Sequence, residues 1–108
     1  MNVEFLPAAS RAILDQADYF ELQASDTLAL RWRIAVNEAV RSLFKFPLVG
    51  SPCRFSAPAL IGLRRIPIPH FQKYLLFYRY SEATSTLEIV HITHGARDLE
   101  TLLAAPTP

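Results

Sequence analysis

The sequence predicts an α+β domain in which an N-terminal helical hairpin packs on a small antiparallel sheet, in the order β-α-α-β-β-β. Two stretches of helical periodicity lie between residues 8 and 46, and two strongly apolar, β-like runs joined by a polar turn follow towards the C-terminus. The hairpin must cover one face of the sheet, because each element has to bury its apolar side. With 108 residues, 51% of them hydrophobic, the chain suits one domain over residues 1–103 and a frayed tail over 104–108.

The first half of the chain predicts a short strand followed by two helices. Residues 3–6 alternate weakly and stop at Pro7, which indicates a short edge strand. Between residues 8 and 22, apolar side chains recur at helical spacing, with acidic ones on the other side. A second helix should end near residues 44–46, because Pro47 disfavours helix at the residue before it. Ser25 suits its N-cap, and its apolar stripe comprises Leu28, Trp32, Ala35, Val36, Ala39 and Leu43.

The second half predicts three strands after an exposed loop over residues 48–58. Residues 59–68 indicate a strand whose end is disturbed by Pro67 and Pro69. Residues 81–85 should form the turn between the last two strands, which cover residues 74–80 and 87–93, and residues 98–103 should form at most a short helical turn. The clearest strand is 74–80, where one face holds Leu75, Phe77 and Arg79 and the other holds Tyr74, Leu76, Tyr78 and Tyr80. The tyrosine face is typical of half-buried packing, although tyrosines can also stack on bases.

Charge is distributed unevenly along the chain, although the net charge is only +1. Residues 31–80 contain nine basic side chains and one acidic one, a balance of +8, whereas residues 1–30 carry −4 and residues 81–108 carry −3. Most of the basic residues are arginine, whose guanidinium suits forked contacts with phosphate and carboxylate. The middle segment predicts an acidic partner, either nucleic acid or an acidic protein surface; the alternative is that these arginines are scattered over a solvated surface.

Cys53 is the only cysteine, so no intramolecular disulfide can form, and no zinc-ligand spacing occurs. It could be a nucleophile if neighbouring Arg54 lowered its pKa, but the sequence places no base for it, and an incidental thiol is the simpler interpretation. A lone cysteine suits a reducing compartment, and the N-terminus lacks a signal-peptide pattern. The apolar runs are too short to span a bilayer. We expect a cytoplasmic protein with no cofactor, no metal site and no membrane partner.

Four motifs together resemble the ParE/RelE superfamily of bacterial toxins. They are GLRRIPI at residues 62–68, YLLFYR at 74–79, EIV at 88–90 and HGARD at 94–98. Weaker similarities are the FxPxA pattern at residues 5–9 and FPLVG at residues 46–50. The resemblance implies the β-α-α-β-β-β toxin fold, reached independently above, and a toxin paired with an antitoxin. ParE-like members act on DNA gyrase, and RelE-like members act on ribosome-bound mRNA.

A ParE-like toxin needs no catalytic group, only a surface that engages gyrase, and this is the first interpretation. The resemblance then implies that the target-binding residues are Arg64, Arg65, Arg79, His91, His94 and Arg97. His91 stands where ParE-like relatives commonly have arginine, so the charge there depends on pH, since histidine titrates near ~6.5. For His94, local capping of backbone groups beside Gly95 is an equally good interpretation. The antitoxin would wrap the hairpin and the sheet, where the expected contacts are Trp32, Val36, Leu43 and Tyr78.

A RelE-like ribosome-dependent mRNA endoribonuclease is the alternative, with Arg97, His94 and His91 as its candidate catalytic residues. That chemistry needs clustered cations with a general acid and a general base. The chain lacks the lysine-rich catalytic strand of that branch, since Lys45 and Lys73 are its only lysines. A third possibility is an inactive relative that only binds antitoxin. Whether the protein is an enzyme stays open at this point.

Overall fold

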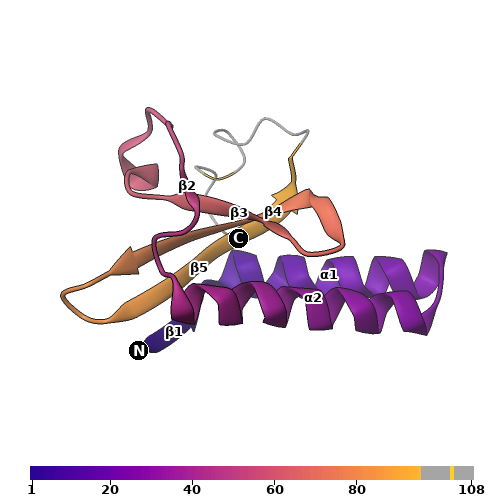
Figure 1. Cartoon of the computed structure of the whole chain (residues 1–108). Coiled ribbons are helices and arrows are strands. Elements are labelled where there is room, and N and C mark those ends of the chain that lie inside the picture. Colours follow the sequence, from indigo (N-terminus) through magenta and orange to yellow (C-terminus); the bar gives the residue numbers. More distant parts are fainter. Residues whose placement is uncertain (96–102, 104–108) are drawn as a thin grey trace.

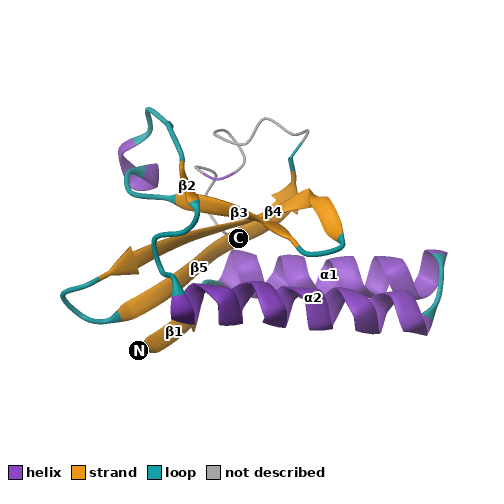
Figure 2. Cartoon of the chain, in the orientation of Figure 1, coloured by secondary structure: helices purple, strands orange, loops and turns teal. Residues whose placement is uncertain are grey.

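A five-stranded mixed sheet carries two helices on one of its faces (Figures 1 and 2). The computed structural model describes residues 1–95 and 103. Its strands are β1 (Asn2–Phe5), β2 (Ser51–Pro52), β3 (Arg64–Ile68), β4 (Phe71–Ser81) and β5 (Thr86–His94), in the spatial order β1-β5-β4-β3-β2. The predicted α+β fold is confirmed, including the position of β1 at an edge. The sheet is mixed, because β1 pairs with β5 in parallel, which a long connection permits and a tight hairpin does not.

The helical hairpin consists of α1 (Pro7–Gln23) and α2 (Asp26–Lys45). Pro7 occupies the first turn of α1, where its missing N–H has no helical partner to lose. At the start of α2, Ser25 Oγ accepts the Leu28 N–H at 3.1 Å, as expected of an N-cap. The end of α2 at Lys45 matches the stop signal of Pro47.

The core lies between the hairpin and the sheet. Trp32 joins the two helices, because its Nε1–H donates to the Ile13 carbonyl at 3.1 Å. Its indole also meets the rings of Phe20, Phe71 and Tyr74 at centroid distances of 5.2 to 5.8 Å. From α2 the buried side chains are Ala29, Trp32, Ala35, Val36, Ala39, Val40 and Leu43. This is the stripe that helical spacing predicted, with Ala29 and Val40 added and Leu28 only partly buried.

The hairpin of β4 and β5 gives the sheet its two distinct faces. Leu76 and Tyr78 belong to the core between the sheet and the helices. Phe77 is buried on the opposite face of the sheet, where its ring lies 6.3 Å from that of Phe55. The alternation predicted for residues 74–80 is therefore confirmed. A bulge between Phe77 and Tyr78 changes the register, so that Tyr78 pairs with Ile89 and Leu76 pairs with Ile92. Both isoleucines consequently face the helices, although they are three residues apart.

The connection from α2 to β3 differs from its prediction. The strand expected over residues 59–68 begins only at Arg64, and Pro58–Leu60 form a short 3₁₀ helix, η1. Pro58 starts this turn because its ring fixes a helical φ, and Gly62 reverses the chain at a φ of +85°. The expected loop over 48–58 includes β2, which pairs with Arg64 and Arg65 of β3. We expected a helical turn over residues 98–103 and a tail over 104–108. Apart from residue 103, these residues lie outside the described part of the chain. No helix in the described part is long and apolar enough to cross a membrane.

Candidate functional site

Five of the six residues predicted to bind a target lie in the described part of the chain, and they are divided between the two faces of the sheet. In the register of β3 and β4, Arg64 pairs with Tyr78 and therefore lies on the helix side, while Arg65 pairs with Phe77 and lies on the opposite side. Arg79 shares the face of Arg65. His91 pairs with Phe77 but lines a cleft beside α1 together with His94. His94 pairs with Tyr74 on the helix side. Arg97 lies outside the described residues. The predicted target-binding set therefore does not form one patch among the residues that the structure describes.

Arg64 holds the chain that follows α2. Its Nη1 donates to the carbonyl oxygens of Leu48 at 3.0 Å and Gly50 at 2.8 Å. The Gly50 N–H donates in turn to the buried Tyr78 Oη at 2.8 Å. Burial raises the pKa of Tyr78, and the smaller opposing effects come from the Gly50 hydrogen bond and the nearby Arg64 charge. Arg64 and Tyr78 therefore fix the position of residues 48–50 on the sheet.

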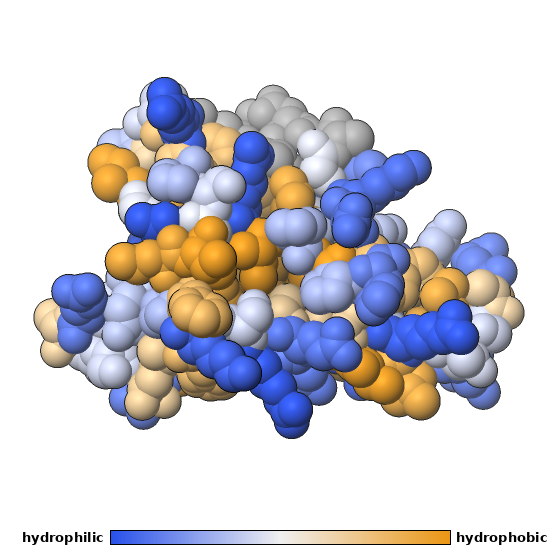
Figure 3. All heavy atoms as spheres, in the orientation of Figure 1, coloured by the Kyte–Doolittle hydropathy of each residue, from blue (hydrophilic) through white to orange (hydrophobic). Residues whose placement is uncertain are grey.

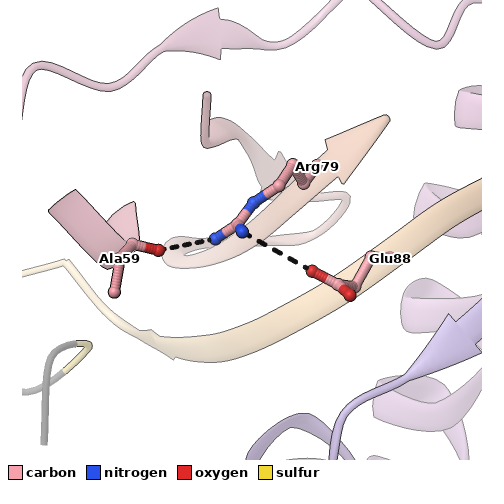
Figure 4. A network of polar contacts seen from close by, with 3 residues as sticks. All are labelled: Ala59, Arg79 and Glu88. Carbon is pink, nitrogen blue, oxygen red and sulfur yellow. Dashed lines mark hydrogen bonds and ion pairs between the residues drawn. The ribbon is translucent and has the colours of Figure 1, made fainter. Parts of the chain in front are cut away.

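Arg79 performs a similar task on the opposite face (Figure 4). Its Nη2 donates to the Ala59 carbonyl of η1 at 2.9 Å, and its Nη1 lies 3.9 Å from Glu88 Oε1 on β5. Both side chains of this ion pair are about one-third exposed, so the pair itself stabilises the fold only weakly. The guanidinium nonetheless ties η1 to the sheet, and Glu88 offsets its charge. Arg65 is left as the exposed cation of β3 on this face.

His91 and His94 line one cleft of ≈ 530 Å³ between α1 and the end of β5. His91 Nδ1 lies 2.8 Å from the Ile92 nitrogen and 3.1 Å from the Ile92 carbonyl oxygen, so it accepts from the first or donates to the second according to its tautomer. The His94 ring packs edge-on against Tyr74, with ring centroids 5.4 Å apart. The other walls come from α1, Trp32 and β5, including Ala12, Asp15, Gln16, Tyr19, Ile92 and Thr93. Two of the three candidate catalytic residues thus share a cleft, and the third, Arg97, is outside the described part.

All four residues expected to contact an antitoxin are buried. Trp32, Leu43 and Tyr78 have no exposed surface, and Val36 is 3% exposed. In the folded chain they pack the core between the helices and the sheet, so their burial does not support a direct contact with a partner. The tyrosines of β4 likewise pack on the core, as their alternation indicated.

Sequence reasoning did not single out the apolar side chains that are exposed. On the helices they include Leu14, Leu22, Leu30 and Ile34. A second group follows from the end of α2 into the next turn and consists of Phe44, Phe46, Leu48 and Val49. Figure 3 shows apolar atoms gathered between the helices and the sheet on one face. The exposure of the second group could have been suspected from the FPLVG run at residues 46–50, because its apolar residues fit neither helical nor strand periodicity.

Cys53 is not an activated thiol. Burial raises the pKa of Cys53, and the smaller opposing effect comes from Arg65, not from its sequence neighbour Arg54. A raised pKa leaves less thiolate at neutral pH and so disfavours nucleophilic attack. The incidental thiol, which the sequence favoured, agrees with this environment.

A family-wide comparison identifies the chain. The sequence profile described as the ParE toxin of the type II toxin-antitoxin system parDE matches residues 3–99. The chain belongs to the ParE toxin family. It is thus a type II toxin of the ParE/RelE superfamily, as its motifs indicated. No curated protein sequence matches it closely.

Solved structures share the fold of this ParE-family chain at low sequence identity. A chain of the chromosomal ParDE system of Pseudomonas aeruginosa superimposes with a TM-score of 0.69 at 16% identity, over 87% of this chain and 95% of that one. A chain of the RelBE2 toxin-antitoxin complex of Mycobacterium tuberculosis gives 0.60 at 23% identity, over 86% and 95%. The YoeB/ParE toxin of Agrobacterium tumefaciens gives 0.57 at 15% identity, over 87% and 98%.

Proposed function

We propose that this toxin inhibits DNA gyrase by binding to it, and that a cognate antitoxin neutralises it. The observation that carries the proposal is the match to the ParE family over residues 3–99, which is most of the chain. Inhibition by binding requires a surface and no catalytic residue. The proposal implies a cytoplasmic protein, because gyrase acts on DNA in that compartment.

The charge of the chain supports an acidic protein as target. Residues 39–81 contain seven basic side chains and no acidic one. Arg64 and Arg79 are engaged in holding loops, which leaves the exposed Arg65 as the cation of β3 best placed to meet a target. Arg65 pairs with Phe77 in the register of β3 and β4, so it lies on the face of the sheet away from the helices. We therefore place the gyrase-binding face on the side of the sheet away from the helices, with Arg65 on it.

The alternative, cleavage of ribosome-bound mRNA, has weaker support from the described residues. His91 Nδ1 lies within hydrogen-bond distance of the Ile92 backbone, so using that nitrogen for proton transfer would disturb this contact. The His94 ring is packed against Tyr74. The structural likeness to the chain from the RelBE2 complex extends to the fold alone. The mRNA assay described below tests directly for catalysis by these histidines.

The antitoxin follows from the type of system to which the family belongs. The similar chains from P. aeruginosa and M. tuberculosis come from structures named for toxin-antitoxin systems. This chain exposes large apolar side chains on both helices and on the turn after α2. We expect free toxin to inhibit growth or to be poorly soluble, because such a surface is normally covered by a partner.

Two assays on the purified protein test the proposal. In the first, gyrase supercoils relaxed plasmid in the presence of increasing toxin, and in the second, ribosomes carrying a defined mRNA receive the same toxin. We expect supercoiling to stop and the mRNA to stay intact. Arg65→Glu should weaken inhibition at least tenfold, whereas Arg11→Glu, an exposed arginine of α1, should leave it unchanged. Cleaved mRNA with normal supercoiling would favour the endoribonuclease, and no effect in either assay would favour an inactive relative that only binds antitoxin.

A further inference from the structure

The turn between α2 and β2 presents apolar side chains that do not contribute to the core. Phe46, Leu48 and Val49 are 64%, 53% and 59% exposed, and Phe44 precedes them on the last turn of α2. Pro47 lies between them in a β-turn closed by a hydrogen bond from the Val49 N–H to the Phe46 carbonyl at 3.1 Å. Proline in the second position of such a turn fixes its φ. The four exposed side chains, here called the turn patch, are Phe44, Phe46, Leu48 and Val49.

The backbone of the turn patch is held firmly, although its side chains are in solvent. The Phe46 N–H donates to the Ser42 carbonyl at the end of α2. Arg64 donates to the carbonyls of Leu48 and Gly50, and Gly50 donates to the buried Tyr78 hydroxyl. A rigid apolar surface loses little conformational entropy when a partner covers it. The turn patch therefore has the properties of a preformed docking surface.

The chain segment that carries the turn patch is basic. Arg41 and Lys45 are exposed on α2, four residues apart and hence on the same side of the helix. The nearest acidic residue before the patch in sequence is Glu38, and the next one after it is Glu82. Apolar atoms in Figure 3 gather next to α2, in the region that the chain crosses after α2 in Figure 1. A partner that fits this surface has apolar side chains flanked by carboxylates.

We propose that the turn patch, with Arg41 and Lys45 beside it, docks an acidic, apolar segment of the antitoxin. This rests on the antitoxin partner proposed above. Charge complementarity favours such a segment over a second copy of this chain, which would bring another basic flank to the same place. An apolar surface of this kind also suits a permanent partner better than a transient target, because permanent interfaces are the more hydrophobic ones. Gyrase is assigned to the opposite side of the sheet, so the two surfaces make separate predictions.

The test co-expresses the tagged toxin with each of its two flanking genes and uses the product that co-purifies with it as the antitoxin probe. The affinity of that probe is then measured for wild-type toxin, Phe46→Glu and Lys45→Glu, with Ile61→Glu as the control. Ile61 is 68% exposed and lies beyond η1, so it matches Phe46 in exposure but not in position. We expect Phe46→Glu to weaken binding at least thirtyfold and Lys45→Glu at least fivefold, with Ile61→Glu unchanged. Circular dichroism checks that each variant is folded.

A second readout separates this inference from the proposed function. Free Phe46→Glu should still inhibit supercoiling as the wild type does, but it should escape the antitoxin. Unchanged antitoxin affinity in both turn-patch variants would overturn the inference, as would loss of gyrase inhibition without loss of antitoxin binding. It would also be overturned if neither flanking product bound wild-type toxin, or if the free toxin formed a dimer that Phe46→Glu dissolved. If wild-type toxin leaves gyrase active while antitoxin binding still depends on Phe46, the proposed target is wrong and the docking surface stands.

Discussion

Gly50 occupies a position where even one methyl group should be costly. A Cβ atom added there would lie 2.6 Å from Tyr78 Oη and 2.7 Å from Tyr78 Cε1, with the Arg65 carbonyl oxygen at 3.0 Å. Tyr78 cannot move aside easily, because its ring has no exposed surface. Gly50→Ala should therefore push the turn away from β4 and break the 2.8 Å hydrogen bond from the Gly50 N–H.

The expected loss of stability follows from these two effects. Overpacking a well-packed site costs typically about 1–3 kcal/mol. The lost hydrogen bond adds about 1 kcal/mol. We expect Gly50→Ala to lower the free energy of unfolding by about 2–4 kcal/mol, which is a large share of the stability of about 5–15 kcal/mol typical of such a domain. With a usual urea dependence, the midpoint of unfolding should fall by roughly 1–3 M.

Urea denaturation followed by circular dichroism measures this loss, and Gly62→Ala is the matched control. Nothing lies within 4 Å of a Cβ at Gly62, but its φ is +85°, so alanine there should cost only the backbone strain of about 1–2 kcal/mol. The two causes separate in a Tyr78→Phe background. Removing the hydroxyl should reduce the Gly50→Ala penalty by about 1 kcal/mol and leave the Gly62→Ala penalty unchanged. A Gly50→Ala loss below about 0.5 kcal/mol would refute the steric reasoning, and a loss that is equal in both backgrounds would refute the hydrogen-bond contribution.

Three further predictions concern the helical hairpin and the buried titratable groups. Ser25→Ala should lower the unfolding free energy by about 1 kcal/mol, whereas Ser25→Gly should cost only a few tenths, as measured by urea denaturation. Trp32→Phe should cost about 1–3 kcal/mol in the same assay, because it removes the hydrogen bond to Ile13 and leaves space in the core. Burial raises the pKa values of Cys53 and Tyr78 above their ordinary values of 9.0 and 10.0, so the unfolded chain loses these protons first and stability should fall as the pH rises past 9. Cys53→Ala should remove the part of this fall that begins near pH 9, and a stability that is constant up to pH 11 would contradict the burial of both groups.

The elements whose signals are local could be predicted from the sequence. Ser25 and Pro47 delimit α2 through hydrogen bonding and sterics that act within a few residues, and both bounds agree with the structure. The alternation along β4 depends only on the pleat of a strand, and it placed Phe77 and Tyr78 on the correct faces. These are features that a chain segment specifies without knowledge of its neighbours.

The features that were missed depend on contacts between distant segments. The parallel pairing of β1 with β5 joins residues more than 80 positions apart, and no local pattern encodes it. The bulge that brings Ile89 and Ile92 to one face is a property of the β4–β5 pair. The late start of β3 does not depend on distant contacts, because the turn-forming residues Pro58 and Gly62 could be recognised in the sequence. Their turn-forming tendency outweighed the apolar character of the residues between them.

The candidate site could have been predicted further than it was. Arg64 and Arg65 are adjacent in a strand, so they had to point to opposite faces, and grouping them in one patch ignored the period of two. In the same way, a stripe of α2 that packs on the sheet could not also be the surface for a partner. This argument alone disfavours Trp32, Val36 and Leu43 as antitoxin contacts, and their burial agrees with it.

The turn after α2 combines a firmly held backbone with exposed apolar side chains. The Leu48 and Gly50 carbonyls and the Gly50 N–H bond to Arg64 and Tyr78, while the apolar side chains of Phe46, Leu48 and Val49 face solvent. Folding alone rewards the reverse arrangement, because burial of apolar surface is the main favourable term. Burying the Tyr78 hydroxyl and holding the Arg64 guanidinium against two carbonyl oxygens both cost free energy, although the exposed side chains of this turn add nothing to the core. Their effect is to keep an apolar surface rigid and exposed, which is useful only when a partner comes to cover it.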